Sequence, residues 1–164
     1  MNLLMMFFRK IVHSWVFKDK YIFPVFLFVF ISDQITKYAV YKNMSLGESI
    51  PAEGIIRITY ARNTGMAFSL FENFGIILLI LSLIIASILI IYLFTIDKPR
   101  ILIRVFSGLV VAGALGNILD RIRFGYVNDF IDVGWWPIFN IADSSITIAI
   151  GIYIFDAIFI QKLK

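Results

Sequence analysis

Long apolar runs, separated by short polar breaks, dominate the chain. A helix that crosses the roughly 30 Å hydrocarbon core of a bilayer needs about 20 mostly apolar residues. Four segments meet this requirement, at residues 21–40, 74–96, 101–119 and 141–160. The first contains Asp33 and Lys37, whereas the second carries no charge. The pattern therefore predicts an α-helical membrane protein with four transmembrane helices.

A different period occurs between the first two predicted spans. Apolar side chains occupy the even positions from 56 to 60, and Arg, Thr and Ala occupy the odd positions from 57 to 61. This alternation is typical of a half-buried strand. Asn63-Thr64-Gly65 then indicates a turn, and a further apolar stretch follows. We expect a small β-sheet in this first outer loop, at the membrane surface.

The composition supports the membrane assignment and limits the chemistry. The chain is 60% hydrophobic and 16% charged, whereas soluble domains are about 45–50% apolar and about 25% charged. Its 164 residues suit one domain, residues 1–164. Cysteine is absent, and the single histidine, His13, lies among basic residues near the N-terminus. A thiol nucleophile is excluded and a histidine-based triad or zinc site is disfavoured, so we expect no metal and no cofactor.

Basic residues outside the spans or near their ends predict the orientation. An even number of spans places nine of them on one side: Arg9, Lys10, Lys18, Lys20, Lys98, Arg100, Arg104, Lys162 and Lys164. The positive-inside rule makes that side the cytoplasm, which therefore holds both termini. The net charge of +4 reflects this topology, and no nucleic-acid partner is expected. Residues 1–20 are interpreted as an amphipathic segment on the inner surface rather than a cleaved signal peptide.

The predicted topology brings four carboxylates to one depth, just below the outer surface. They are Asp33, Asp120, Asp129 and Asp143. A charge there costs a few kcal/mol, so such residues tend to be paired or functional. Asp33 has Lys37 one helical turn away and Asp120 lies beside Arg121, whereas Asp129 and Asp143 have no basic neighbour in the sequence. The last two are therefore the strongest candidates for chemistry.

The other two acids near these spans have a simpler interpretation. Asp132 and Asp156 are expected to be solvated or interfacial. Amides gather at the level of the four carboxylates, at Asn63, Asn117 and Asn140. They could hold a peptide backbone where bulk water is scarce, although Asn140 also suits a helix cap. In the third span, Gly113 and Gly116 belong to a small-residue face that favours close helix packing and could also admit a ligand.

Two nearby carboxylates in a poorly solvated site can share one proton. The ionised member can deprotonate a water, and the protonated member can donate to a carbonyl oxygen and a leaving amine. That is the chemistry of an aspartyl protease. Glycoside hydrolysis also uses paired acids, but carbohydrate-binding polar groups are sparse. An ion- or proton-coupled transporter with intramembrane acids is the alternative from another class, although no internal repeat is visible.

Five segments of the chain, in order, resemble the motifs of the lipoprotein signal peptidases, the type II signal peptidases. They are Asp33-Gln34-Ile35-Thr36-Lys37, Asn63 to Phe68 (NTGMAF), Ala112 to Arg121 (AGALGNILDR), Val127-Asn128-Asp129-Phe130 and Phe139 to Ser144 (FNIADS). One motif alone is weak, whereas five in order across most of the chain are highly specific. The resemblance implies four helices, cytoplasmic termini and a small sheet on the outer leaflet of a bacterial inner membrane.

The same resemblance implies an activity and its site. Members of the family cut the signal peptide from prolipoproteins just before a diacylglyceryl-modified cysteine, and globomycin-type peptides inhibit them. Carried onto this sequence, the catalytic pair is Asp129 and Asp143. Binding or support roles are implied for Asp33, Lys37, Asn63, Asn117, Arg121 and Asn140. The segment before the first span is long for the family, and the connection from Asp129 to Asn140 is short.

Overall fold

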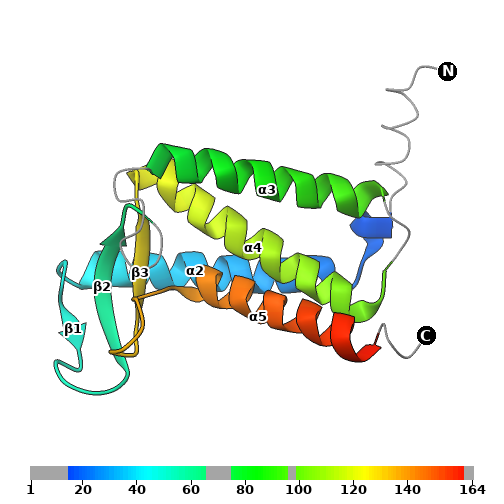
Figure 1. The fold of residues 1–164 in the computed structure, drawn as a ribbon. Coiled ribbons are helices and arrows are strands. Elements are labelled where there is room, and N and C mark those ends of the chain that lie inside the picture. Colours follow the sequence, from blue (N-terminus) through cyan, green and yellow to red (C-terminus); the bar gives the residue numbers. More distant parts are fainter. Residues whose placement is uncertain (1–14, 66–74, 96–98, 161–164) are drawn as a thin grey trace.

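The computed structural model describes residues 15–65, 75–95 and 99–160 (Figure 1). Long helices lie side by side, and a small sheet covers one end of them. The described chain begins and ends at the opposite end from the sheet, as an even number of helices requires. Most of the predicted amphipathic segment, residues 1–20, lies outside the described residues.

Four helices coincide closely with the predicted spans. They are α2 (Ile22–Asn43), α3 (Gly75–Thr95), α4 (Ile101–Phe124) and α5 (Ile141–Phe155), which continues into the π-helical turn η3 (Asp156–Ile160). A 3₁₀ turn, η1 (Trp15–Lys18), precedes them. By length and composition, α2, α4 and the continuous segment formed by α5 and η3 could each cross a membrane. The apolar part of α3, Leu79–Phe94, is shorter.

Helix α4 is the centre of the arrangement and packs against α2, α3 and α5. It continues past the predicted end at Leu119 as far as Phe124. Gly125 then ends it with a φ of 79°, in the left-handed region that glycine adopts without steric cost. The extra turn makes Asp120 and Arg121 part of the helix, so the helical backbone fixes the direction of their side chains.

The small-residue face of α4 is a close packing surface for α5. At Gly113, a Cβ atom would lie 2.5 Å from the carbonyl oxygen of Ala142 and 2.5 Å from the hydroxyl of Ser145. That hydroxyl donates to the carbonyl oxygen of Leu109 over 3.1 Å, which further ties the two helices. Of the two roles considered for this face, the structure confirms helix packing.

The sheet has three antiparallel strands in the order β1 (Ser49–Ile50), β2 (Arg57–Asn63) and β3 (Val127–Asp132). The prediction confined it to the first loop, and this was wrong for one strand, because β3 belongs to the connection between α4 and α5. Nearly every residue of β3 is buried. With both faces covered and polar residues at three of its positions, the strand lacks the alternating pattern that identified β2.

The expectation that Asp132 and Asp156 are solvated was also wrong. Asp132 is 5% exposed, and it pairs with Arg57 over 2.8 Å and accepts from the Thr59 hydroxyl over 2.8 Å. Asp156 is fully buried and pairs with Arg100 over 2.7 Å. Both partners are distant in sequence, so neighbouring residues gave no sign of them. The free-energy cost of burying these two charges is offset by ion pairs with arginines that are distant in the chain.

Candidate active site

Asp129 lies in the middle of β3, opposite Ala61 of β2. It is 2% exposed. The side-chain amide of Asn63, at the end of β2, donates to its Oδ2 over 2.9 Å. The amide of Asn140 donates to its Oδ1 over 2.6 Å. Both carboxylate oxygens therefore have a donor, and the backbone of a sheet fixes their position.

Asp143 lies in the first turn of α5. The side-chain oxygen of Asn140 accepts the backbone N–H of Asp143 over 2.9 Å, so Asn140 is the N-cap of the helix. The amide of Asn117, from α4, donates to Oδ1 of Asp143 over 2.8 Å. Unlike Asp129, Asp143 is partly exposed, which leaves one member of the pair accessible.

The amides form a continuous bridge between the two carboxylates. Asn140 contacts Asp129 through its nitrogen and the Asp143 backbone through its oxygen. Its nitrogen also donates to Oδ1 of Asn117 over 3.2 Å, and Asn117 in turn contacts the Asp143 carboxylate. The helix cap expected at Asn140 is therefore confirmed, and the same side chain also contacts Asp129 of the candidate pair.

A buried lysine lies beneath this bridge. Nζ of Lys37, on α2, is 2.9 Å from Asp33 Oδ2 and 3.5 Å from Asp120 Oδ2. It also donates to Oδ1 of Asn117 over 2.9 Å. The predicted pairing of Asp33 with Lys37 is confirmed, and the lysine also offsets the charge of Asp120. Through Asn117, the same ammonium group is connected to Asp143.

Asp33 also holds the start of α5. Its Oδ1 accepts the backbone N–H of Ala142 over 2.9 Å, a group that has no partner within the first helical turn. The opposing residue on α4 is Gly116, where a Cβ atom would lie 2.6 Å from Asp33 Oδ2. Glycine at that position gives the carboxylate the space to reach across α4, and this explains one half of the small-residue pair.

Asn128 is a contributor that the sequence analysis did not identify. Its backbone N–H and its side-chain amide both donate to Oδ2 of Asp120, over 2.9 and 3.1 Å. Asp120 is 2% exposed and is therefore a buried acceptor rather than an interfacial acid beside Arg121. The contact fixes β3 on the end of α4, one residue from Asp129. The sequence signal that could have identified Asn128 is its position immediately before Asp129.

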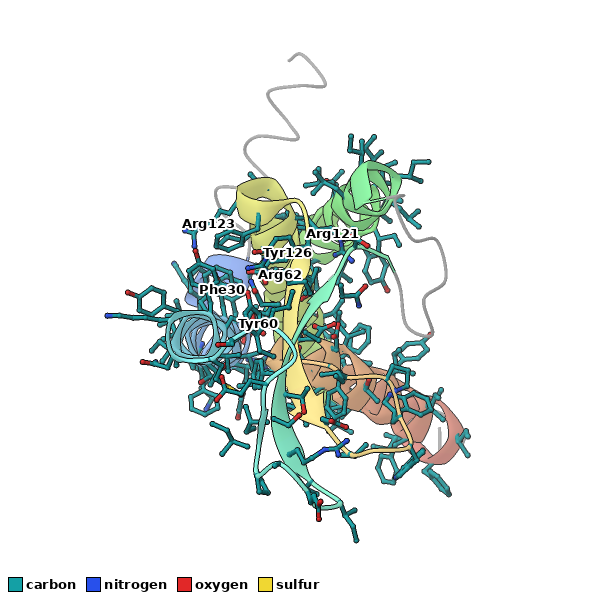
Figure 2. All side chains as sticks on the ribbon, turned by 90° about the vertical axis from the view of Figure 1, so that its left-hand side faces the viewer. Phe30, Tyr60, Arg62, Arg121, Arg123 and Tyr126 are labelled. Atoms are coloured by element: carbon teal, nitrogen blue, oxygen red, sulfur yellow. The ribbon has the colours of Figure 1, made fainter. Side chains whose placement is uncertain are left out.

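Arg121 lies on the next position of α4 and faces the same site. Its guanidinium donates to the carbonyl oxygen of Gly65 over 3.4 Å, a long contact. In Figure 2, which views the molecule from the sheet end, Arg121 lies towards α3. The structure thus gathers all eight predicted site residues around the junction of α2, α4, α5 and the sheet.

The environment of Asp129 changes its acidity. Burial, followed by the negative charge of Asp143, raises the pKa of Asp129 to about 7. The hydrogen bonds from Asn63 and Asn140 oppose that rise because they stabilise the ionised form. A carboxyl group with a pKa near neutrality can both donate and accept a proton under physiological conditions. Among the described residues, no three acidic side chains converge as a metal site would require.

Apolar helices around amide-bound carboxylates are consistent with a membrane protease of the aspartic type. The chain belongs to the signal peptidase II family, because the family model described as "Signal peptidase (SPase) II" matches residues 25–159. That match includes every predicted site residue. Family membership and the apolar helices together fit a membrane-embedded bacterial protein.

Individual relatives agree with this assignment. The chain is similar to a lipoprotein signal peptidase of Halothermothrix orenii, with 37% identity over 81% of this chain and 92% of the relative. It is similar to that of Syntrophus aciditrophicus, with 39% identity over 83% and 91%. A solved bacterial membrane enzyme shares 34% identity over 87% of this chain and 90% of that chain, with a TM-score of 0.80.

Proposed function

We propose that this protein is a membrane aspartyl endopeptidase that removes the signal peptide of prolipoproteins by cutting before a diacylglyceryl-modified cysteine. Family membership supports the removal of lipoprotein signal peptides, and the site supports the mechanism. Asp129 and Asp143 are the proposed catalytic pair. The transporter alternative gains nothing from the relatives, which are peptidases by name.

The main support for this proposal is the bridge that Asn140 makes between the two acids. It donates to Asp129 and fixes the first turn of α5, which holds Asp143. Two carboxyl groups positioned in this way can act on opposite sides of one reacting peptide group. Such positioning is the main contribution that a rigid site makes to a hydrolytic reaction.

In the first step, the Asp143 carboxylate removes a proton from a water molecule, whose oxygen adds to the carbonyl carbon before the cysteine. Protonated Asp129 gives its proton to the carbonyl oxygen. Two observations support these roles: Asp143 is the more exposed acid, and the raised pKa of Asp129 keeps it partly protonated near neutral pH. The product of this step is a neutral tetrahedral diol.

In the second step, the protons return. Asp143 donates its proton to the nitrogen of the cysteine, the carbon–nitrogen bond breaks, and Asp129 takes a proton from one hydroxyl of the diol. Both acids are then in their starting states, and no covalent bond to the enzyme has formed. Asn63 and Asn140 hold Asp129 throughout, and Asn117 holds Asp143 while Lys37 offsets the surrounding negative charge.

The proposed location is the bacterial inner membrane, with both termini in the cytoplasm and the sheet and site near the outer leaflet. Its support is the cluster of basic residues at the chain ends and at the turn between α3 and α4. A reporter fused after Lys164 should be active only if the reporter functions in the cytoplasm. Activity of a reporter that requires the periplasm would contradict this orientation.

A cleavage assay tests the function itself. Purified protein in detergent or lipid should cut a precursor peptide that carries a diacylglyceryl cysteine, and mass spectrometry should locate the cut directly before that cysteine. The same peptide without the lipid is the matched control and should be cut much more slowly. Globomycin-type peptides should block the reaction. Cleavage at another bond, or of both peptides equally, would contradict the proposed specificity.

A further inference from the structure

Arg62 is an exposed cation at the sheet end of the molecule, where it contacts the rings of Tyr60 and Tyr126. Its Nε donates to the hydroxyl of Tyr60 over 3.0 Å. Its guanidinium carbon lies 4.7 Å from the centre of the Tyr126 ring and 5.6 Å from that of Tyr60. Figure 2 shows the three side chains together, between α2 and the end of α4. The contacts fix the direction of the guanidinium.

No described residue forms an ion pair with Arg62 that would neutralise its charge. Among the described residues, each ion pair at the sheet end involves either Lys37 or Arg57, and none involves Arg62. The two tyrosines occupy one edge and one face of the guanidinium. Several of its five N–H donors therefore remain available in a planar fork, a geometry that matches the oxygens of a phosphate.

The rings around Arg62 belong to a longer aromatic band. Phe124 stacks on Tyr126 with ring centres 5.7 Å apart, and Tyr41 contacts Phe124 with centres 5.6 Å apart. Tyr41 lies in the last turn of α2, and Phe124 is the last residue of α4. Both rings are exposed. Aromatic side chains at the ends of membrane helices lie at the level of the lipid headgroups, so Arg62 lies at that level too.

We propose that Arg62, seated on Tyr60 and Tyr126, binds the phosphate of an anionic phospholipid at the membrane surface on the sheet side. Tyr41 and Phe124 flank the glycerol and upper acyl region of that lipid. The site is distinct from the catalytic pair but is connected to it. Arg62 precedes Asn63, which contacts Asp129, so a lipid bound there holds the end of β2 in place.

The first test measures lipid binding directly. The full-length protein is placed in nanodiscs of mixed phosphatidylcholine and phosphatidylglycerol, and the lipids that remain bound are identified by native mass spectrometry. The wild type should retain phosphatidylglycerol in preference to phosphatidylcholine. Arg62→Gln should reduce that preference about ten-fold, since a hydrogen bond to a charged group is lost. Arg62→Lys should give an intermediate value, because it keeps the charge without the planar fork.

Arg123→Gln is the matched control. Arg123 is exposed in the last turn of α4, so its replacement removes the same charge at the same end of the molecule. Arg123 is not part of the cluster of Arg62, Tyr60 and Tyr126. Its loss should weaken the preference for phosphatidylglycerol by at most about five-fold, as expected for diffuse surface attraction. Equal effects of the two Gln variants, or no lipid preference in the wild type, would overturn the proposed site.

Cleavage kinetics separate lipid binding from substrate binding. In nanodiscs of phosphatidylcholine alone, Arg62→Gln should cut a lipidated precursor peptide as fast as the wild type, which also shows that the variant is folded. When phosphatidylglycerol is added, the wild type should become faster and the variant should not. An increase in KM for the variant in phosphatidylcholine alone would show that Arg62 contacts the peptide, and the proposal would be wrong.

Discussion

The side-chain amide of Asn140 donates to Asp129 over 2.6 Å while its oxygen caps α5. One residue thus joins the strand that holds Asp129 to the helix that holds Asp143. Because Asn140 contacts both elements, it holds Asp129 and the first turn of α5 in fixed positions relative to each other.

Replacement of Asn140 should lower turnover more than stability. Asn140→Ala removes a hydrogen bond to a charged group, worth about 1.5–3 kcal/mol, so kcat should fall roughly ten- to a hundred-fold. Asn140→Ser is the matched variant, since serine can still cap α5 but cannot reach Asp129. It should recover the melting temperature without recovering kcat. If kcat of Asn140→Ala equals that of the wild type, Asn140 is only a helix cap.

Gly113→Ala should separate α4 from α5. The added methyl group would lie 2.5 Å from a backbone oxygen of Ala142, which cannot move without shifting the start of α5. Overpacking of this kind typically costs about 1–3 kcal/mol, and a lower melting temperature in detergent should report it. Gly151→Ala is the control, because outside its own helical turn no described atom lies within 4 Å of its Cβ position. That variant should be neutral or slightly stabilising.

The raised pKa of Asp129 predicts a pH-dependent cost to the folded state. The folded protein keeps a proton on Asp129 up to about pH 7, whereas the unfolded chain loses it near pH 4. Stability from this group is therefore complete below about pH 4 and is lost as the pH rises towards 7, by an amount of the order of a few kcal/mol. Asn at position 129 has no such titration.

The melting temperature of Asp129→Asn relative to wild type should accordingly be higher at pH 8 than at pH 5. Any pH-independent effect of the substitution, such as an altered contact with Asn63, cancels in this comparison. Asp132→Asn serves as the reference, since Asp132 is ion-paired with Arg57 and its loss should not produce the same trend. A difference that is constant with pH would contradict the raised pKa of Asp129.

Much of the fold could be predicted because membrane helices leave a strong signal. Every predicted span overlaps a helix of the structure, and the alternation at residues 56–61 located β2. Strand β3, which was not predicted, is short and buried on both faces, so its sequence VNDFID shows no period of two. Its position as a third strand depends on pairing with β2, a contact between residues more than 60 positions apart.

The candidate site was predictable in its residues but not in its connections. Asp129 and Asp143 stood out as acids in an apolar setting without a neighbouring base, and the family motifs named the rest. The partners of Asp120 could not be read from the sequence, because Lys37 and Asn128 reach it from different elements. The same applies to Asp132 and Asp156, whose arginine partners are distant in the chain. Burial of charge is decided by tertiary contacts, and composition does not reveal these.

If Asp129 and Asp143 act as one catalytic unit, the cleavage of a lipidated precursor peptide by Asp→Asn variants should show it. Asparagine is nearly isosteric with aspartate but cannot take a proton from water or return one. Asp129→Asn and Asp143→Asn should each abolish cleavage in folded protein, and the double variant should be no worse than either. Asp132→Asn is the matched control in the same strand, since it can keep the bond from Thr59, and it should retain most activity. Cleavage by Asp129→Asn together with inactivity of Asp132→Asn would contradict the account.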